Sequence, residues 1–409
     1  MNESLSITRM FLPFYKNRNY FSFLCLYIHM NFKKKFDTKE ALNIDPLSLK
    51  TNRILELDGL RAFAVLLVVF YHMVYWAKSI PFIHQTNEIL PLIGEEGVHI
   101  FFVISGFIIT FLLIKEYEAT GKISLVSFYQ RRFFRIIPPL LAYLSTVCIL
   151  YMLGVITTNY TNLIWSILFL GNLHLFEGGM SSYWFFGHTW SLAVEEQYYL
   201  IFPLIMVWLL SFRKMTAITI LSIILFCFSI GVNRIALAAS EHISPEWIKL
   251  SAFNQFRYII AGVLLALHKH KIEKMVKNTS LFIPFLLIAF IITTYYVSEY
   301  KLLFYSLHTI IAFIYALLIM WFMSNPEKCS VLRWRVIQWI GRCSYSIYLW
   351  QQLFTGDARF YNTRSIAQSP ILATIAILSC ATISYYFIEI PCMRFGRILS
   401  KPKNIESLT

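Results

Sequence analysis

An arginine and a histidine stand eleven positions apart in an apolar segment near the start of the chain. Residues 57 to 73 read LDGLRAFAVLLVVFYHM, and the two residues are Arg61 and His72. At 100° per residue, eleven residues make three turns plus about 20°, so a helix would present both side chains on one face, about 16 Å apart along its axis. A guanidinium binds anions, and an imidazole transfers protons near neutral pH. The pair therefore predicts an anion-binding end and a proton-transfer end on one helix. The alternative is that Arg61 pairs with Asp58 and His72 bonds to a neighbouring helix.

Two adjacent carboxylates lie in another apolar segment, HTWSLAVEEQYYLIFP, at Glu195 and Glu196. Two carboxylates in a membrane-spanning helix cannot both face lipid cheaply, so at least one should meet a cation, an imidazole or a cavity. The functional interpretation is that Glu195 orients His72 from a facing helix, as carboxylates do for catalytic imidazoles. The alternative is that Glu195 braces a loop arginine while Glu196 reaches the interface.

A basic block, YQRRFFRIIPP, precedes a further apolar segment and places Arg132 and Arg135 three residues apart. Two guanidinium groups on one side of a helix suit a phosphate or pyrophosphate, because each binds oxygen pairs bidentately. The alternative is an ordinary basic anchor that orients the protein in the membrane.

Other polar residues in apolar segments favour less specific interpretations. Ser105, next to Gly106, is more typical of close helix packing than of a nucleophile. His99 is interpreted as an interface residue, and the polar positions of GRCSYSIYLWQQ, residues 341–352, either line a cavity or form a packing seam. The seven cysteines include no CxxC pair, so neither a disulfide framework nor a metal site is expected.

The composition requires apolar elements to position these residues. The chain has 409 residues, of which 57% are hydrophobic and 14% charged, and its mean hydropathy is +0.60. Repeated long apolar runs are typical of helices that cross a hydrocarbon core of about 30 Å. The net charge of +14 gathers in short loops, which indicates membrane orientation rather than nucleic-acid binding. The predicted fold is an all-α polytopic integral membrane protein with about ten crossings, near 60–78, 97–114, 136–156, 190–212, 215–232, 253–268, 279–297, 302–323, 336–355 and 368–390.

The run at 161–176 decides the orientation. If it crossed the membrane, the basic turn at 213–214 and the loop after His268 would lie outside, against the positive-inside rule. We therefore predict that 161–176 is re-entrant or interfacial and that both termini are cytoplasmic. The expected divisions are a basic extension, a membrane domain and a short cytoplasmic tail, over 1–52, 53–400 and 401–409. For the extension, a surface-lying anchor and a translation start at Met30 are the alternatives.

Five ordered blocks, which cover roughly residues 53 to 397, resemble the acyltransferase 3 family of bacterial membrane proteins. They are LDGLRAFAVLLVVFYH, GVHIFFVISGFIIT, FYQRRFFRIIPP, HTWSLAVEEQYYLIFP and IGRCSYSIYLWQQ, followed by a weaker YYFIEIPCMRFGR. The chain departs from many relatives at His99, where they have Asp, and at Gln351, where they have His.

This resemblance implies the transfer of an acyl group, usually acetyl, from cytoplasmic acyl-CoA across the bacterial inner membrane to a carbohydrate hydroxyl. It implies that Arg61 and His72 are the functional pair, and that Arg132 and Arg135 hold the donor's phosphates. It implies acyl-CoA as a donor substrate and no tightly bound cofactor. The expected partners are the acyl-CoA, the carbohydrate acceptor, the lipid bilayer and polysaccharide-assembly proteins.

Two other classes of protein remain open from the residues alone. A transporter of a sugar or lipid-linked glycan would use His72 and Glu195 as a proton relay, and would show proton-coupled uptake without acyl consumption. An assembly scaffold would tolerate replacement of its polar intramembrane residues. An acyltransferase would instead consume acyl-CoA in a reaction that depends on His72.

Overall fold

The structure is a computed structural model. It describes residues 54–76, 90–173, 180–211, 215–238, 252–295, 301–357, 360–362 and 369–400. The chain divides into two units, Met1–Arg53 and Ile54–Thr409, and all the described residues belong to the second. The predicted extension 1–52 and tail 401–409 lie outside the described residues.

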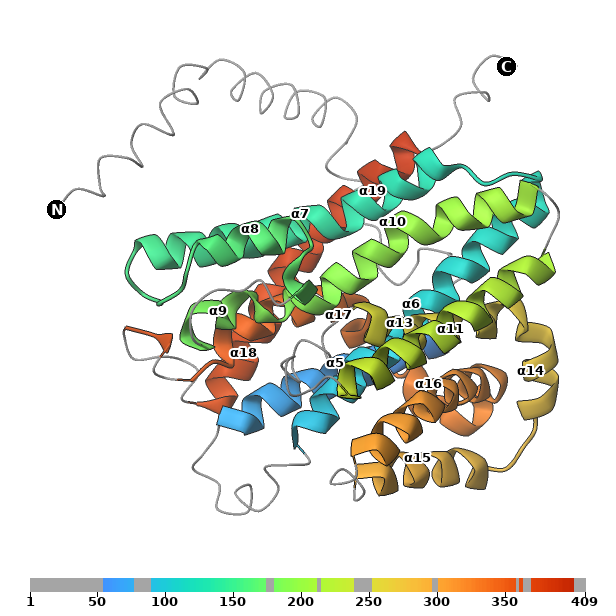
Figure 1. Cartoon of the computed structure of the whole chain (residues 1–409). Helices are drawn as coiled ribbons and strands as arrows, with labels where there is room; N and C mark the ends of the chain where they lie inside the picture. Colours follow the sequence, from blue (N-terminus) through green and yellow to red (C-terminus); the bar gives the residue numbers. More distant parts are fainter. Residues whose placement is uncertain are drawn as a thin grey trace, which may run out of the picture. The chain divides into compact units, whose positions relative to one another are not determined.

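The described part of the second unit is built from helices (Figure 1), as the sequence predicts, and its only β pairing is an isolated bridge between Ile156 and Tyr361. The α-helices are α5 (Leu55–Trp76), α6 (Leu90–Thr120), α7 (Leu125–Met152), α8 (Thr161–Ile167), α9 (Met180–Gly187), α10 (Thr189–Ser211), α11 (Met215–Ala238), α13 (Ala252–Leu267), α14 (Lys269–Val276), α15 (Phe282–Tyr295), α16 (Lys301–Ser324), α17 (Arg335–Phe354), α18 (Pro370–Ser384) and α19 (Ile390–Leu399). A π-helical turn, Tyr385–Glu389, joins α18 to α19.

Each predicted apolar run overlaps one of these helices, or α18 and α19 together. By length and composition, four described helices could cross a membrane, or five if a pair bent by 94° counts as one span. The four are Gly94–Thr120, Leu125–Met152, Tyr183–Leu210 and Pro370–Leu399. Shorter apolar stretches occur in α11, α13 and α15, and α17 carries serines and glutamines among its apolar residues. The count of ten crossings and the cytoplasmic termini remain predictions.

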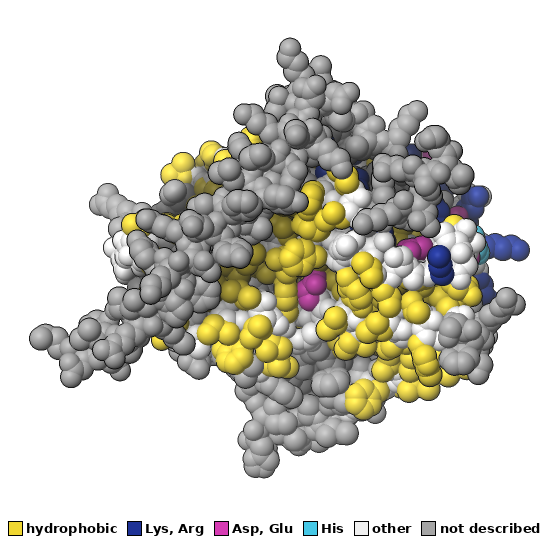
Figure 2. Space-filling model, turned by 90° about the horizontal axis from the view of Figure 1, so that it is seen from above, with side chains coloured by type: hydrophobic (Ala, Val, Ile, Leu, Met, Phe, Trp, Pro, Cys, Tyr) yellow, Lys and Arg dark blue, Asp and Glu magenta, His cyan; other side chains and the backbone are white. Residues whose placement is uncertain are grey.

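The surface is apolar over wide areas, as the lipid-facing side of a membrane protein requires. Exposed large side chains include Leu200, Leu204 and Trp208 on α10 and Ile220 and Ile224 on α11. Where Figure 2 draws described residues, hydrophobic side chains predominate, with few charged groups among them. Soluble monomers seldom expose apolar patches of this extent.

The described part of 161–176 is too short to cross a bilayer as a helix. It forms the seven-residue α8 and a 3₁₀ turn, Gly171–Leu173, and seven residues rise only about 10 Å. Its backbone and side chains bond to α10: Asn172 exchanges two hydrogen bonds with Gln197 at 3.1 and 2.9 Å, and Gln197 also donates to the carbonyl of Phe169. The element is thus tied to a neighbouring helix at its irregular end.

Glycines bring the central helices into backbone contact. A Cβ on Gly106 of α6 would collide with the carbonyl oxygen of Ile259 on α13, and one on Gly262 of α13 would collide with that of Val103. Gly341 of α17 lies in the same way on the carbonyl of Asp58 in α5. Helix α6 therefore packs against α5 and α13, and α5 packs against α17. This packing fixes the walls of the site.

Candidate active site

A pocket opens between α5, α6, α7, α10 and α17. Its empty space is about 820 Å³ when counted out to its open mouth, within the range of small-molecule sites. Its polar lining residues are Arg61, Ser105, Arg132, Arg135, Ser191, Glu195, Glu196, Tyr199, Ser344, Tyr345 and Tyr348, and the apolar ones come mainly from α6. Four of the five predicted site residues, from three different helices, line this one pocket.

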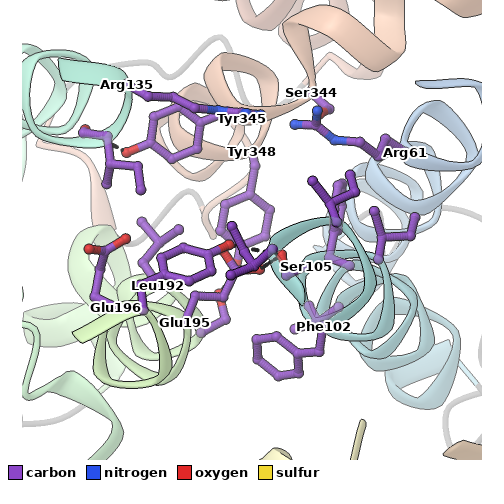
Figure 3. A pocket seen from close by; sticks show the side chains of 18 of the residues that line it. Arg61, Phe102, Ser105, Arg135, Leu192, Glu195, Glu196, Ser344, Tyr345 and Tyr348 are labelled. Carbon is purple, nitrogen blue, oxygen red and sulfur yellow. Dashed lines mark hydrogen bonds between the residues drawn. The ribbon is translucent and has the colours of Figure 1, made fainter. Parts of the chain in front are cut away.

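Three guanidinium groups face the pocket, and none has an ionic partner in the described ranges of the chain. Arg61 comes from α5 and Arg135 from α7 (Figure 3), and Arg132, three residues before Arg135 on α7, lines the same pocket. Among the described residues no carboxylate pairs with any of the three, although other arginines of the described chain do form such pairs, such as Arg131 with Glu116 at 3.5 Å. The pocket lining holds these three guanidinium groups and two carboxyl groups, Glu195 and Glu196, so cationic groups are in excess and are not held in ion pairs among the described residues. The pocket is therefore suited to a polyanion.

Glu195 is held by the opposite wall. Its Oε1 accepts a hydrogen bond of 2.6 Å from the Ser105 hydroxyl on α6, and its Oε2 accepts one of 3.4 Å from Tyr199. The Tyr199 hydroxyl also lies within 3.0 Å of Ser105 Oγ, and its ring lies 4.8 Å from the Arg132 guanidinium carbon. The carboxylate thus faces the arginines across the pocket but bonds to neither them nor His72. Glu196 also lines the pocket.

Helix α17 supplies the third wall. Tyr345 donates a hydrogen bond of 2.8 Å to the carbonyl of Ile136 on α7, and the buried Ser344 hydroxyl has no partner within the described part of the chain. Tyr348 donates to the carbonyl of His188 at 3.0 Å and lies 2.6 Å from the Ser191 hydroxyl. Both interpretations of the segment 341–352 therefore hold. Its polar residues line a cavity, and Gly341 forms a packing seam with α5.

His72 lies beyond the pocket, three turns along α5 from Arg61. Its Nδ1 is 2.9 Å from the carbonyl oxygen of Val68. Since a carbonyl only accepts, Nδ1 carries the hydrogen, and the neutral ring keeps a free lone pair on Nε2. The ring meets the edge of Trp184 at 5.7 Å between centroids. The interpretation that Glu195 orients His72 is not supported here, because the two make no hydrogen bond and each has other partners.

His99 and Ser105 differ from their first interpretations. His99 is buried, bonds to Glu96 at 3.0 Å and stacks on Tyr258 at 3.8 Å. Ser105 is a hydrogen-bond donor to Glu195 rather than a packing residue alone, and its place beside Gly106 gave no sign of this. The spacing of Ser344 and Tyr348, by contrast, is visible in the sequence, because residues four apart share one face of a helix. No group of metal-ligating side chains able to hold an ion occurs among the described residues.

The sequence blocks that supply these walls belong to a known domain. A family model for the acyltransferase domain of the acyltransferase 3 type matches residues 54–389. The chain belongs to this family. All five predicted site residues, Arg61, His72, Arg132, Arg135 and Glu195, fall within the match.

Curated relatives of this acyltransferase 3 protein include O-acetyltransferases. The chain is 29% identical over 367 residues to "O-acetyltransferase OatA" of Staphylococcus aureus (strain NCTC 8325 / PS 47), covering 83% of this chain and 57% of that one. It is 27% identical over 382 residues to "Putative peptidoglycan O-acetyltransferase YrhL" of Bacillus subtilis (strain 168), covering 83% and 55%. The chain thus spans little more than half the length of these relatives. No solved structure matches the chain significantly.

Proposed function

We propose that this protein transfers an acyl group, acetyl in the first instance, from acyl-CoA on the cytoplasmic side of the bacterial inner membrane to a hydroxyl of a cell-surface or lipid-linked carbohydrate. The observation that carries the proposal is the pocket lined by Arg61, Arg132 and Arg135, none of which is paired with a carboxylate among the described residues. CoA is a nucleotide polyanion on a long thin arm, and the three guanidinium groups of the pocket supply positive charge for its phosphates. The carbohydrate acceptor is taken from the relatives' names.

The residues divide the work along the pocket. Arg132 and Arg135 would bind the phosphates, and Arg61 would contribute a third cation from α5. Glu195, held by Ser105 and Tyr199, would limit the cationic surface on the facing wall and so position the donor. The arm would extend toward Ser191 and Tyr348, where the lining ends on α10 and α17.

His72 would serve as the base for the acceptor. Because Val68 fixes the hydrogen on Nδ1, Nε2 is the atom that would accept the hydroxyl proton. Its distance of about 16 Å from Arg61 along the helix suits a thioester held far from the nucleotide. An acyl-histidine formed at the same atom would be detected by trapping of the intermediate.

Mass spectrometry of surface glycans tests the function directly. A strain with the gene should show an added mass of one acyl group per modified sugar, and both a deletion strain and one carrying His72→Ala should lack it. Fragmentation names the sugar and the acyl group. Unchanged glycan masses in the deletion strain, together with no consumption of acetyl-CoA by the purified protein, would overturn the proposal.

A further inference from the structure

The imidazole of His188 is buried and has no hydrogen-bond partner among the residues that the structure describes. The residue is 4% exposed, and both ring nitrogens are out of contact with solvent and unpaired. A buried polar group without a partner costs about 1–3 kcal/mol, and native proteins retain few of them. An apolar side chain of similar size would fill the same space without this cost. A histidine at this position therefore indicates another state of the protein, in which its ring nitrogens form hydrogen bonds.

One side of His188 adjoins the donor pocket. Its ring lies between Tyr348, at 5.6 Å between centroids, and Tyr143, at 5.2 Å. Tyr348 lines the pocket with Ser191, and its hydroxyl is held by the His188 carbonyl and the Ser191 hydroxyl. A single aromatic ring thus separates the imidazole from the part of the pocket lined by Ser191 and Tyr348.

The other side of His188 leads to His72. Trp184 precedes His188 by four residues in the continuous span Tyr183–Leu210, about one helical turn. The Trp184 ring makes the edge contact with His72. His188 therefore stands between the acyl end of the pocket and the proposed base. The transfer proposed for His72 and the arginines makes no use of it.

We propose that His188 donates an N–H hydrogen bond to the acyl carbonyl oxygen during transfer, after the Tyr348 side chain turns aside. This inference rests on the proposed function. In the transfer the acceptor oxygen bonds to the acyl carbon, the carbon–sulfur bond breaks and its electron pair leaves on sulfur. The acceptor's proton passes to Nε2 of His72 and then to the CoA thiolate. His188 gains and loses no proton, and it stabilises the negative charge that develops on the carbonyl oxygen.

The chemistry of the site separates this role from a structural one. An imidazole kept for packing would be replaced by leucine with no loss, and removal of an unpaired buried group would leave stability equal or higher. If the imidazole serves catalysis, its removal should lower the turnover rate without lowering the stability of the protein. His188→Leu removes the donor, whereas His188→Gln keeps an N–H donor of similar reach.

The experiment uses the full chain in proteoliposomes, with acetyl-CoA as donor, a chito-oligosaccharide as acceptor and thiol release as the readout. His188→Leu should lower kcat by about 100-fold or more, the usual effect of losing one oxyanion donor, with KM for acetyl-CoA within about threefold of wild type. His188→Gln should recover at least about a tenth of wild-type kcat. The unfolding temperature of His188→Leu should equal or exceed that of wild type.

Trp350→Phe is the matched control. Trp350 also packs against Tyr143, at 5.7 Å between ring centroids, and it too has a buried, unpaired ring nitrogen. It does not line the pocket, so this variant should keep wild-type kcat.

Three outcomes would overturn the inference. His188→Leu could keep wild-type kcat, or it could lose kcat together with stability, or His188→Gln could lose as much as His188→Leu. If the wild type itself transferred no acetyl group, the proposed function would fail and this inference with it. A wild type that transfers, beside a His188→Leu variant that matches it, would refute only the role of His188.

Discussion

Arg135 and Arg131 stand four residues apart on α7 but differ in what they face. Arg135 lines the pocket and pairs with no carboxylate of the described residues, while Arg131 does not line it and pairs with Glu116. One charge-assisted contact to a phosphate is worth about 1.5–3 kcal/mol. Arg135→Ala should therefore weaken acetyl-CoA binding by roughly ten- to a hundredfold, measured by calorimetry on purified protein.

The neighbouring arginine supplies the control for this prediction. Arg131→Ala removes the same charge from the same helix and should change the dissociation constant by less than about twofold, since exposed pairs contribute little. Arg135→Lys should recover only part of the affinity, because an ammonium cannot reproduce the bidentate fork. Equal effects of Arg131→Ala and Arg135→Ala would return the basic block to the role of a membrane-orientation signal.

His72 should affect turnover and not donor binding, because it lies outside the pocket that holds the three arginines. Loss of a general base typically lowers the rate by about 10²–10⁴-fold. His72→Ala should show this loss in thiol release from acetyl-CoA, with the acetyl-CoA dissociation constant unchanged. His270→Ala, which removes an exposed imidazole on α14, should leave both quantities as in wild type. Wild-type turnover by His72→Ala would exclude the imidazole as the base.

At the scale of elements, α6 and α13 depend on a close backbone approach. Gly262 of α13 lies against the carbonyl of Val103 and the amide of Phe107, which belong to backbone and cannot move aside like a flexible side chain. Gly262→Val should therefore lower stability by about 1–3 kcal/mol, the usual cost of overpacking, and should disturb the α6 wall of the pocket.

Gly231 of α11 gives the comparison for that helix contact. A Cβ there would meet nothing within 4 Å, so Gly231→Ala should leave stability unchanged or raise it by up to about 1 kcal/mol through helix propensity. Both variants can be compared by thermal unfolding in detergent. An unfolding temperature for Gly262→Val equal to that of wild type would show that the two helices separate without cost.

The helices themselves could be predicted, because long apolar runs have few other structures open to them. Arg61, Arg132, Arg135 and Glu195 could also be singled out, since charge in an apolar run must be accommodated. The residues that these side chains contact in the fold could not be predicted. Helical periodicity says that Arg61 and His72 share a face of α5, but it does not say which neighbour meets that face, and this depends on contacts such as Gly341 on Asp58.

For Glu195, too, the sequence indicates that a polar partner is needed but does not identify that partner. Its carboxylate required a polar partner, and the nearest predicted candidate was His72; the structure supplies Ser105 and Tyr199 instead. A serine next to a glycine in an apolar helix predicts packing as readily as hydrogen bonding. The tertiary arrangement alone distinguishes the two. His188 could not be selected as a candidate site residue for the same reason, since burial without a hydrogen-bond partner cannot be predicted from the sequence.

At the scale of the molecule, the described contacts bear on how often the chain crosses the membrane. Arg131 pairs with Glu116 near the C-terminal end of α6, and the Lys269 ammonium lies 5.4 Å from the ring of Phe111, five residues earlier on the same helix. Five residues rise about 7.5 Å. The first turns of α7 and the segment after α13 therefore meet at one end of α6. An extra crossing at 161–176 would place them on opposite sides.

Cysteine labelling with a membrane-impermeant reagent tests this arrangement. In a background with the seven native cysteines replaced, cysteines at positions 131 and 269 should both resist labelling in intact cells and react after permeabilisation, because basic loops stay cytoplasmic. A cysteine at Gln85, which lies between the first two predicted crossings, 60–78 and 97–114, and so on the predicted outer side, should react in intact cells; the structure of Gln85 lies outside the described residues. Labelling of position 269 but not 131 from outside would mean that 161–176 crosses, and that the shared end of α6 is not kept in the membrane. Labelling of both would keep the shared end but invert the whole protein, which would put the arginine pocket out of reach of cytoplasmic acyl-CoA.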